Sequence, residues 1–299
     1  MKILNFGSLN IDFVYHVEHF VRPGETISAG SRQVFCGGKG LNQSIALARS
    51  GVRVYHAGAV GKDDGGILCE ALRKNSINTD FIVQCDDVST GHAIIQVNST
   101  GQNCIILYGG ANQTIGREHI DKTLQSFTRG DFLILQNEIN MLDYIIEQAR
   151  NRGLVIVLNP SPMNEKIQAL PLKYVDYFML NEVEAVDICG SDDQEKLLES
   201  LSQMYPEARI VLTLGKYGVK YRDSRETLSH GIYEVPVVDT TAAGDTFTGF
   251  FIGSLVQGYD ISEALRLASI AASISVSRHG AETSIPYMDE VKNSRLKAL

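Results

Sequence analysis

The stretch DTTAAGD, residues 239–245, combines small residues with one carboxylate in a pattern that suits phosphoryl transfer. Ala242, Ala243 and Gly244 carry almost no side chain, so their amides at the start of a helix can face a ligand, where the helix dipole adds positive potential. Asp245 in the same turn could accept a proton from an attacking hydroxyl while these amides absorb the developing negative charge. The alternative interpretation is that Asp245 only caps the helix.

Short hydrogen-bonding side chains stand at or near the ends of several apolar runs. In an open parallel sheet, ligands bind beyond the carboxyl ends of the strands, so these positions have the best access to a ligand. A neutral polyol needs many hydrogen bonds to replace its water, and a suitable set is present: Asn10, Asp12, Lys39, Asn42 and Glu138. Asn10 and Asp12 could be simple turn residues, and GGKG at 37–40 could be a flexible turn before a helix. GGKG is not a Walker A loop, because Gly-x-x-x-x-Gly-Lys-Ser/Thr occurs nowhere in the sequence.

The elements that must position these residues are short apolar runs alternating with helical patterns. Short apolar runs lie at 2–7 and 52–61. Four further runs are nearly all apolar on both alternating faces, as expected for parallel strands covered on both sides, and they lie at 132–137, 154–160, 175–181 and 209–215. Helical patterns fall between or after them, including 42–51, 65–75, 246–258 and 261–278. We therefore predict an α/β fold, a doubly wound and mostly parallel sheet with helices on both faces.

Two segments, about 11–36 and 90–108, break this rhythm with antiparallel signals and no helix between the strands. The second contains a Ser-Thr-Gly turn at 99–101 between alternating strands, which favours a hairpin. We predict that both segments form a small β-sheet lid on a single α/β domain that spans 1–299. The alternative is that they are edge strands of the main sheet.

The composition limits the possible partners. The net charge of −8 predicts repulsion of nucleic acid and of anionic membranes, so we expect neither as a partner. No apolar run approaches about 18 residues, and the N-terminus lacks the apolar region of a signal peptide, so no membrane span is expected. The five cysteines are scattered without a Cys-x-x-Cys pair, which is typical of reduced thiols in a cytoplasmic protein.

Several motifs together identify a family resemblance. GGKGLNQSIALARSGVRVYHAGAVG at 37–61 and DTTAAGDTFTG at 239–249 match two signatures of the ribokinase family of carbohydrate kinases, also called the phosphofructokinase B family. Asn181-Glu182-Val183-Glu184 resembles the Asn-x-x-Glu motif of that family, and NPSP at 159–162 is similar as well. The resemblance runs from residue 10 to residue 286.

The resemblance implies a ribokinase-like fold and ATP-dependent transfer of the γ-phosphate to the 5-hydroxyl of D-ribose, giving D-ribose 5-phosphate. It implies that Asp245 is the catalytic base and contacts the sugar, and that Ala242, Ala243 and Gly244 form the anion hole. The sugar would be held by Asn10, Asp12, Gly38, Lys39, Asn42 and Glu138. ATP would be held by Asn181, Thr213, Gly215, Gly218, Gly244 and Ser269, the last near the adenine. Glu184 would act through water on Mg²⁺ and phosphate.

The resemblance also implies an activating K⁺ site and a homodimer that pairs the lid sheets. The K⁺ ligands would be the carboxylate of Asp239, the hydroxyl of Ser284, and the backbone carbonyls of Thr241, Ser275, Arg278 and Gly280. A ring of carbonyls beside the loop at 239–245 could hold that loop in shape.

Three positions depart from the family pattern: Leu180 replaces a proline, Phe250 replaces alanine or glycine, and Ser269 replaces a histidine expected beside the adenine. The alternatives within the family are a kinase for another sugar, such as fructose or deoxyribose, or for a nucleoside. A catalytically silent sensor of sugar or nucleotide is a further alternative, against which Asp245, Gly244 and Asn181 argue. A dinucleotide-dependent dehydrogenase is disfavoured because no Gly-x-Gly-x-x-Gly follows the first strand.

Overall fold

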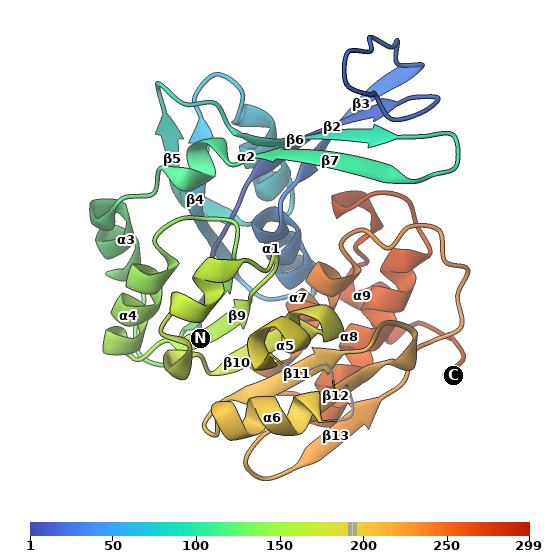
Figure 1. Cartoon of the computed structure of the whole chain (residues 1–299). Coiled ribbons are helices and arrows are strands. Elements are labelled where there is room, and N and C mark those ends of the chain that lie inside the picture. Colours follow the sequence, from blue (N-terminus) through green and yellow to red (C-terminus); the bar gives the residue numbers. More distant parts are fainter. Residues whose placement is uncertain (191–192, 194–195) are drawn as a thin grey trace.

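The structure is a computed structural model that describes residues 1–190, 193 and 196–299. Its main sheet contains β1 (Ile3–Phe6), β4 (Val54–Gly61), β5 (Asn78–Cys85), β8 (Phe132–Gln136), β9 (Val155–Asn159), β10 (Tyr177–Asn181), β11 (Arg209–Thr213), β12 (Val219–Arg222) and β13 (Thr227–His230). Within the described residues these nine strands lie in the order β13-β12-β11-β10-β9-β8-β1-β4-β5 (Figure 1). The pairs β11–β12 and β12–β13 are antiparallel, and all other neighbours are parallel.

Helices cover both faces of this sheet: α1 (Lys39–Arg49), α2 (Gly66–Lys74), α3 (Arg117–Leu124), α4 (Leu142–Arg152), α5 (Glu182–Cys189), α6 (Leu197–Met204), α7 (Ala243–Val256), α8 (Ile261–Val276) and α9 (Met288–Lys292). Short 3-10 helices lie at Gly110–Gln113, Glu165–Ala169, Leu172–Tyr174, Gly215–Tyr217 and Glu282–Ser284. Successive residues of β8 face opposite sides of the sheet and belong to different hydrophobic cores. Ile134 packs in the core with α1, α7 and α8, whereas Leu133 and Leu135 pack in the core with α3 and α4. This alternation explains why the strands are apolar throughout.

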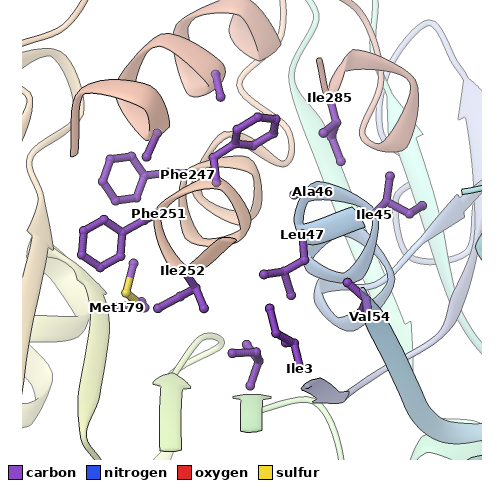
Figure 2. Packing of buried hydrophobic residues seen from close by; sticks show 14 of the residues in the cluster. Ile3, Ile45, Ala46, Leu47, Val54, Met179, Phe247, Phe251, Ile252 and Ile285 are labelled. Carbon is purple, nitrogen blue, oxygen red and sulfur yellow. The ribbon is translucent and has the colours of Figure 1, made fainter. Parts of the chain in front are cut away.

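Helices α1 and α7 pack closely because small residues face each other along their contact. A Cβ atom on Gly249 would clash with Ala46, and one on Gly253 would clash with Ser50. Figure 2 shows the surrounding apolar side chains of α7 and α1, which gather with Ile3 and Val54 of the sheet. Phe250, which departs from the family pattern, is fully buried in this core. Asp245 lies one turn before Gly249 on α7, and Asn42 lies one turn before Ala46 on α1. The close packing of the two helices therefore brings Asp245 and Asn42 together.

A separate sheet contains β2 (Asn10–His16), β3 (Ser31–Gly37), β6 (Gly91–Val97) and β7 (Asn103–Tyr108). Its four strands lie in the order β3-β2-β6-β7, and the sheet extends away from the main body (Figure 1). Two antiparallel pairs are joined by a parallel pairing of β2 with β6. The predicted fold class, including this small sheet, is confirmed, and the alternative that these strands are edges of the main sheet is wrong.

Several element boundaries differ from the sequence prediction. Helix α7 begins at Ala243 rather than at 246, so Asp245 lies inside its first turn. Strand β5 was not predicted, because buried and exposed residues do not alternate regularly along it. The short antiparallel strands β12 and β13 also lack a strong apolar run. In the part of the chain that the structure describes, no helix has the length and apolarity needed to cross a membrane.

Candidate active site

A cavity of about 220 Å³ lies at the N-terminal end of α7. It is lined by residues from α1, α5, α7 and the ends of β9, β10 and β11, at the carboxyl edge of the main sheet. The cavity brings together many of the residues singled out from the sequence: Lys39, Asn181, Glu184, Thr213, Ala242, Ala243, Gly244 and Asp245. This location is where ligands bind in open parallel sheets.

The first turn of α7 presents backbone amides to this cavity. Ala242 has the left-handed φ of 59°, an uncommon conformation for a residue with a side chain and one that functional sites often contain. The amides of Gly244 and Asp245 have no hydrogen-bond partner among the described residues, whereas the amide of Ala243 donates to the Thr240 carbonyl at 3.3 Å. A Cβ atom on Gly244 would meet no atom within 4 Å, because that side of Gly244 is open. This turn can bind an anion mainly through Gly244 and Asp245.

The carboxylate of Asp245 does not cap the helix, so the capping interpretation is wrong. Instead, Asn42 Nδ2 donates to Asp245 Oδ2 at 3.1 Å, and Gln43 Nε2 donates to Oδ1 at 2.9 Å. Asp245 is 8% exposed and lines the cavity. A carboxylate held in this way can accept a proton from a bound hydroxyl.

Asn10, Asp12 and Glu138 lie where the small sheet joins the main body. Asn10 Oδ1 accepts a hydrogen bond from Asn112 Nδ2 at 2.8 Å, which leaves the Asn10 NH₂ group to donate elsewhere. Burial, with a smaller contribution from the Glu138 carboxylate, raises the pKa of Asp12 to about 7. Burial is also the main cause of the raised pKa of Glu138. Two acids with raised pKa values at the base of one sheet are typical of a functional site.

Lys39 connects the two halves of the site, since its amide donates to Glu138 Oε2 at 3.0 Å while its side chain lines the cavity. Burial lowers the pKa of its ammonium group, but the carboxylates of Asp245, Glu138 and Glu184 outweigh burial, and the net pKa is raised. The ammonium group therefore stays charged. The neighbouring Gly38 has a φ of 94°, which favours glycine at this position.

Asn181 and Glu184 line the far side of the cavity and form a capping box at the start of α5. Asn181 Oδ1 accepts from the amide of Glu184 at 3.0 Å, and Asn181 Nδ2 donates to Glu184 Oε1 at 2.8 Å. Thr213 also lines the cavity, and the short helix that begins at Gly215 follows it. Gly218, just after that helix, has a φ of 87°. Gly215, Gly218 and Ser269 do not line the cavity, and Ser269 is buried in α8.

The residues expected to hold K⁺ come together beside the first turn of α7. Asp239 accepts hydrogen bonds from the amide of Thr241 at 2.9 Å and from the amide of Gly280 at 3.0 Å. Ser275 Oγ lies 2.8 Å from Ser284 Oγ, and the amide of Arg278 donates to the Ser275 carbonyl. Burial raises the pKa of Asp239, but the hydrogen bonds from Thr241 and Gly280 together lower it by a larger amount. The net pKa of Asp239 is therefore lowered. An anionic carboxylate among hydroxyls and carbonyls is a donor set that suits a hard cation.

Sequence reasoning missed residues that hold the site from behind. Ser8 Oγ hydrogen-bonds Glu138 Oε2, and Asn112 bonds both Asn10 and the backbone of Leu9. Gln43 reaches Asp245 directly. Gln43 lies next to Asn42, so its place at the start of α1 was a usable signal, but Asn112 gave none, because its partners are more than 100 positions away.

Comparisons with known proteins agree with this architecture. Residues 1–288 match the model of the pfkB family carbohydrate kinases. The chain is 34% identical to a ribokinase of Staphylococcus aureus, over 97% of this chain and 98% of the relative, and 28% identical to a deoxyribokinase of Salmonella typhi, over 97% of each. The structure of Arabidopsis thaliana ribokinase complexed with ribose and ATP aligns with a TM-score of 0.88 at 28% identity, over 97% of each chain. The chain belongs to the pfkB family of carbohydrate kinases.

Proposed function

We propose that this protein is a ribokinase, which transfers the γ-phosphate of ATP to the 5-hydroxyl of D-ribose and yields D-ribose 5-phosphate and ADP. The observation that carries the proposal is the position of Asp245, whose carboxylate lines the cavity beside the amides of Gly244 and Asp245, which have no partner within the described part of the chain. A proton acceptor next to anion-binding amides is the arrangement that phosphoryl transfer to an alcohol needs. The similarity to ribokinases over nearly the whole chain supports the choice of sugar.

In the proposed reaction, Asp245 accepts the proton of the 5-hydroxyl as the sugar oxygen attacks the γ-phosphorus. A bond forms between O5 and phosphorus, and the bond from phosphorus to the bridging β,γ-oxygen breaks, leaving ADP. The amides of Gly244 and Asp245, aided by the α7 dipole, stabilise the negative charge on the transferring group, with a smaller share from Ala243 and Ala242. The charged Lys39 side chain in the same cavity adds to this stabilisation.

We assign the sugar to Asn10, Asp12, Gly38, Lys39, Asn42 and Glu138. Two observations support this assignment. Asn42 Oδ1 is buried and lacks a hydrogen-bond partner among the described residues, so a sugar hydroxyl could satisfy it. Asn10 directs its NH₂ group away from Asn112, which provides a donor for a sugar oxygen.

ATP is assigned to Asn181, Glu184, Thr213, Gly215, Gly218, Gly244 and Ser269. Asn181, Glu184, Thr213 and Gly244 line the cavity, which supports their part of the assignment. Glu184 would hold Mg²⁺ through water, and the ion would supply positive charge that offsets the charge of the phosphates. Both carboxylate oxygens of Glu184 already accept hydrogen bonds from Asn181, which is compatible with a role through water rather than direct coordination.

We further propose that K⁺ binds among Asp239, Thr241, Ser275, Arg278, Gly280 and Ser284. Thr246 Oγ1 lies 3.4 Å from Ser275 Oγ, so this oxygen-rich cluster is in contact with the first turn of α7. An ion bound there would hold the backbone of that turn, and with it the amides that line the cavity.

The small sheet is proposed to act as a lid on a single kinase domain, and to pair with the lid of a second copy in a homodimer. Asn10 and Asp12 belong to β2, so the lid carries part of the sugar site. The apolar strand β7 is exposed along its length, and pairing would cover it. We expect the enzyme to work in the cytoplasm, where ATP is available and its free cysteines stay reduced.

A coupled assay of ADP formation over a panel of sugars and nucleosides tests the proposal. We expect the highest kcat/KM with D-ribose, and a phosphate ester at O5 by ³¹P NMR. The similarity to a deoxyribokinase makes deoxyribose the strongest competitor. Preferential turnover of deoxyribose, fructose or adenosine would contradict the choice of ribose, and binding without turnover would favour the sensor alternative.

A further inference from the structure

A chain of buried side-chain amides runs from Asp245 into the main sheet. Gln43 Nε2 donates to Asp245 Oδ1 at 2.9 Å, and Gln136 Nε2 donates to Gln43 Oε1 at 2.7 Å. The same Gln136 nitrogen donates to Asn5 Oδ1 at 2.9 Å. Gln43, Gln136 and Asn5 are each 0% exposed. Burying several amides in an apolar core costs free energy unless they are paired, so a simpler apolar packing could have filled this space.

The direction of these hydrogen bonds is set by Gln136. An amide NH₂ group has two hydrogens, and Gln136 uses them on Asn5 and Gln43. Gln43 therefore presents its oxygen to Gln136 and must turn its own NH₂ group toward Asp245. Gln136 Oε1 is buried without a partner among the described residues. The Gln136 amide thus keeps its NH₂ group on Asn5 and Gln43 even though this leaves its own oxygen unsatisfied.

The far end of the chain fixes the same direction. Asn5 Nδ2 donates to the Gly40 carbonyl at 2.7 Å and to Ser44 Oγ at 2.8 Å, so Asn5 Oδ1 must be the acceptor for Gln136. Ser44 Oγ lies 2.7 Å from His56 Nδ1, and burial lowers the pKa of His56 to about 4, so the imidazole is neutral. Asn5 and His56 are direct neighbours on β1 and β4. The whole chain is uncharged up to Asp245 and is anchored on adjacent strands.

Neutral donors suit a general base. A carboxylate that must accept a proton needs partners that fix its orientation, and an amide such as that of Gln43 does this without placing a positive charge directly against the carboxylate. With Asn42 on Oδ2 and Gln43 on Oδ1, the carboxylate plane of Asp245 is held in place. Its remaining lone pairs are available to the cavity that it lines.

We infer that Gln43 and Gln136 are positioning residues for phosphoryl transfer: Gln136 orients the Gln43 amide, and Gln43 holds the carboxylate of Asp245 toward the acceptor hydroxyl. This inference rests on the proposed function, because it requires Asp245 to be the base. Neither glutamine lines the cavity, so neither is expected to touch sugar or ATP.

Isosteric variants separate this role from a packing role. Gln43→Met and Gln136→Met keep the side-chain volume close to that of glutamine but cannot donate, and Gln43→Glu keeps the shape while placing an acceptor against Asp245. We expect kcat to fall about 10- to 100-fold in Gln43→Met, as for loss of a hydrogen bond to a charged group, and by a similar or smaller factor in Gln136→Met, which leaves the Gln43 amide without its orienting partner. The KM values for sugar and ATP should stay within about twofold. Gln43→Glu should have a lower kcat than Gln43→Met.

The double variant Gln43→Met/Gln136→Met tests whether the two glutamines act in series. Because Gln136 acts through Gln43, we expect the double variant to have the kcat of Gln43→Met alone rather than the product of the two losses. Thr123→Val is the control, since Thr123 on α3 is fully buried and its hydroxyl lacks a partner among the described residues. This control should keep the kcat of the unmodified enzyme. Thermal unfolding of every variant checks that each one is folded at the assay temperature.

The outcomes are distinguishable. Transfer by the unmodified enzyme together with kcat values within about threefold of it in Gln43→Met and Gln136→Met would overturn the inference alone. Additive losses in the double variant, or losses confined to KM, would also overturn it. If the unmodified enzyme phosphorylates a different sugar, the same ratios are measured with that sugar. Absence of any phosphoryl transfer by the unmodified enzyme would overturn both the proposed function and the inference.

Discussion

The end of the site that contains Asp245 lies between closely packed helices, whereas the end that contains Asp12 belongs to a sheet whose apolar residues reach solvent. Around Asp245, the contact of α1 with α7 excludes any side chain larger than glycine at 249 and 253. In the small sheet, Ile105, Ile106, Leu107 and Tyr108 are 54%, 61%, 52% and 49% exposed. The Asp245 end is closely packed, and the small sheet at the Asp12 end has an exposed apolar face.

This difference indicates a division of labour. The groups proposed for phosphoryl transfer lie on the main sheet and its helices, where packing fixes them, as catalysis requires. Asn10 and Asp12 lie on β2 of the small sheet. We therefore expect changes at the α7 end to alter kcat, and changes in the small sheet to alter the KM for sugar or the state of association.

The largest effect is expected from Asp245→Asn. Loss of the general base should lower kcat by about 10²- to 10⁴-fold, because proton acceptance contributes a factor of that size. Binding of sugar and nucleotide, measured by calorimetry, should be retained. If Asp245→Asn keeps most of the original kcat, Asp245 is not the general base, and the α7 end of the site does not have the role assigned to it.

The exposed face of the small sheet is tested by Ile106→Asp. If this face pairs with a second copy, a buried unpaired charge there should raise the dimer dissociation constant by about 100-fold or more, as measured by analytical ultracentrifugation. Thr100→Asp, in the exposed turn before β7, is the matched control and should leave the association unchanged. An unmodified protein that is monomeric at micromolar concentration would contradict the homodimer.

Gly244→Ala should separate stability from activity. The added methyl group would project into the open side of Gly244 and obstruct the transferring phosphate, so we expect kcat to fall by about 10- to 100-fold. Because alanine favours a helix more than glycine does, the free energy of unfolding should rise by about 0.4–1 kcal/mol. Gly66→Ala, at the first position of α2 and equally open, should stabilise without affecting kcat. Unchanged kcat in Gly244→Ala would exclude Gly244 from the phosphate site.

The smallest effect concerns pH and the small sheet. Burial raises the pKa of Asp12 to about 7, and the ionised form is the one proposed to accept hydrogen bonds from sugar hydroxyls. Its protonated fraction grows as the pH falls, so the KM for sugar should rise by up to about tenfold between pH 8 and pH 6. In Asp12→Asn, the KM should be higher and nearly independent of pH in this window. A pH-independent KM in the unmodified enzyme would show that Asp12 does not bind the sugar in its ionised form.

Local patterns in the sequence were enough to predict the fold class and to single out the small-residue turn that starts α7 and lines the cavity. The strands of the main sheet follow from their apolar runs, and the turn follows from Ala242 to Asp245. The antiparallel strands β12 and β13 were missed because they are short and partly exposed. The contacts that decide the role of Asp245 join it to Asn42 and Gln43, 203 and 202 positions away, and only tertiary packing creates them. Local sequence marks Asn42 and Asp245 as candidate site residues, but it does not show which atoms of these distant residues pair.

The most direct test is a crystal structure with D-ribose and a non-hydrolysable ATP analogue bound together. The account predicts that O5 of the sugar lies within about 2.6–3.2 Å of an Asp245 carboxylate oxygen, with the γ-phosphate on the amide of Gly244. A sugar bound with O5 beyond the reach of Asp245, or a γ-phosphate away from the first turn of α7, would contradict it.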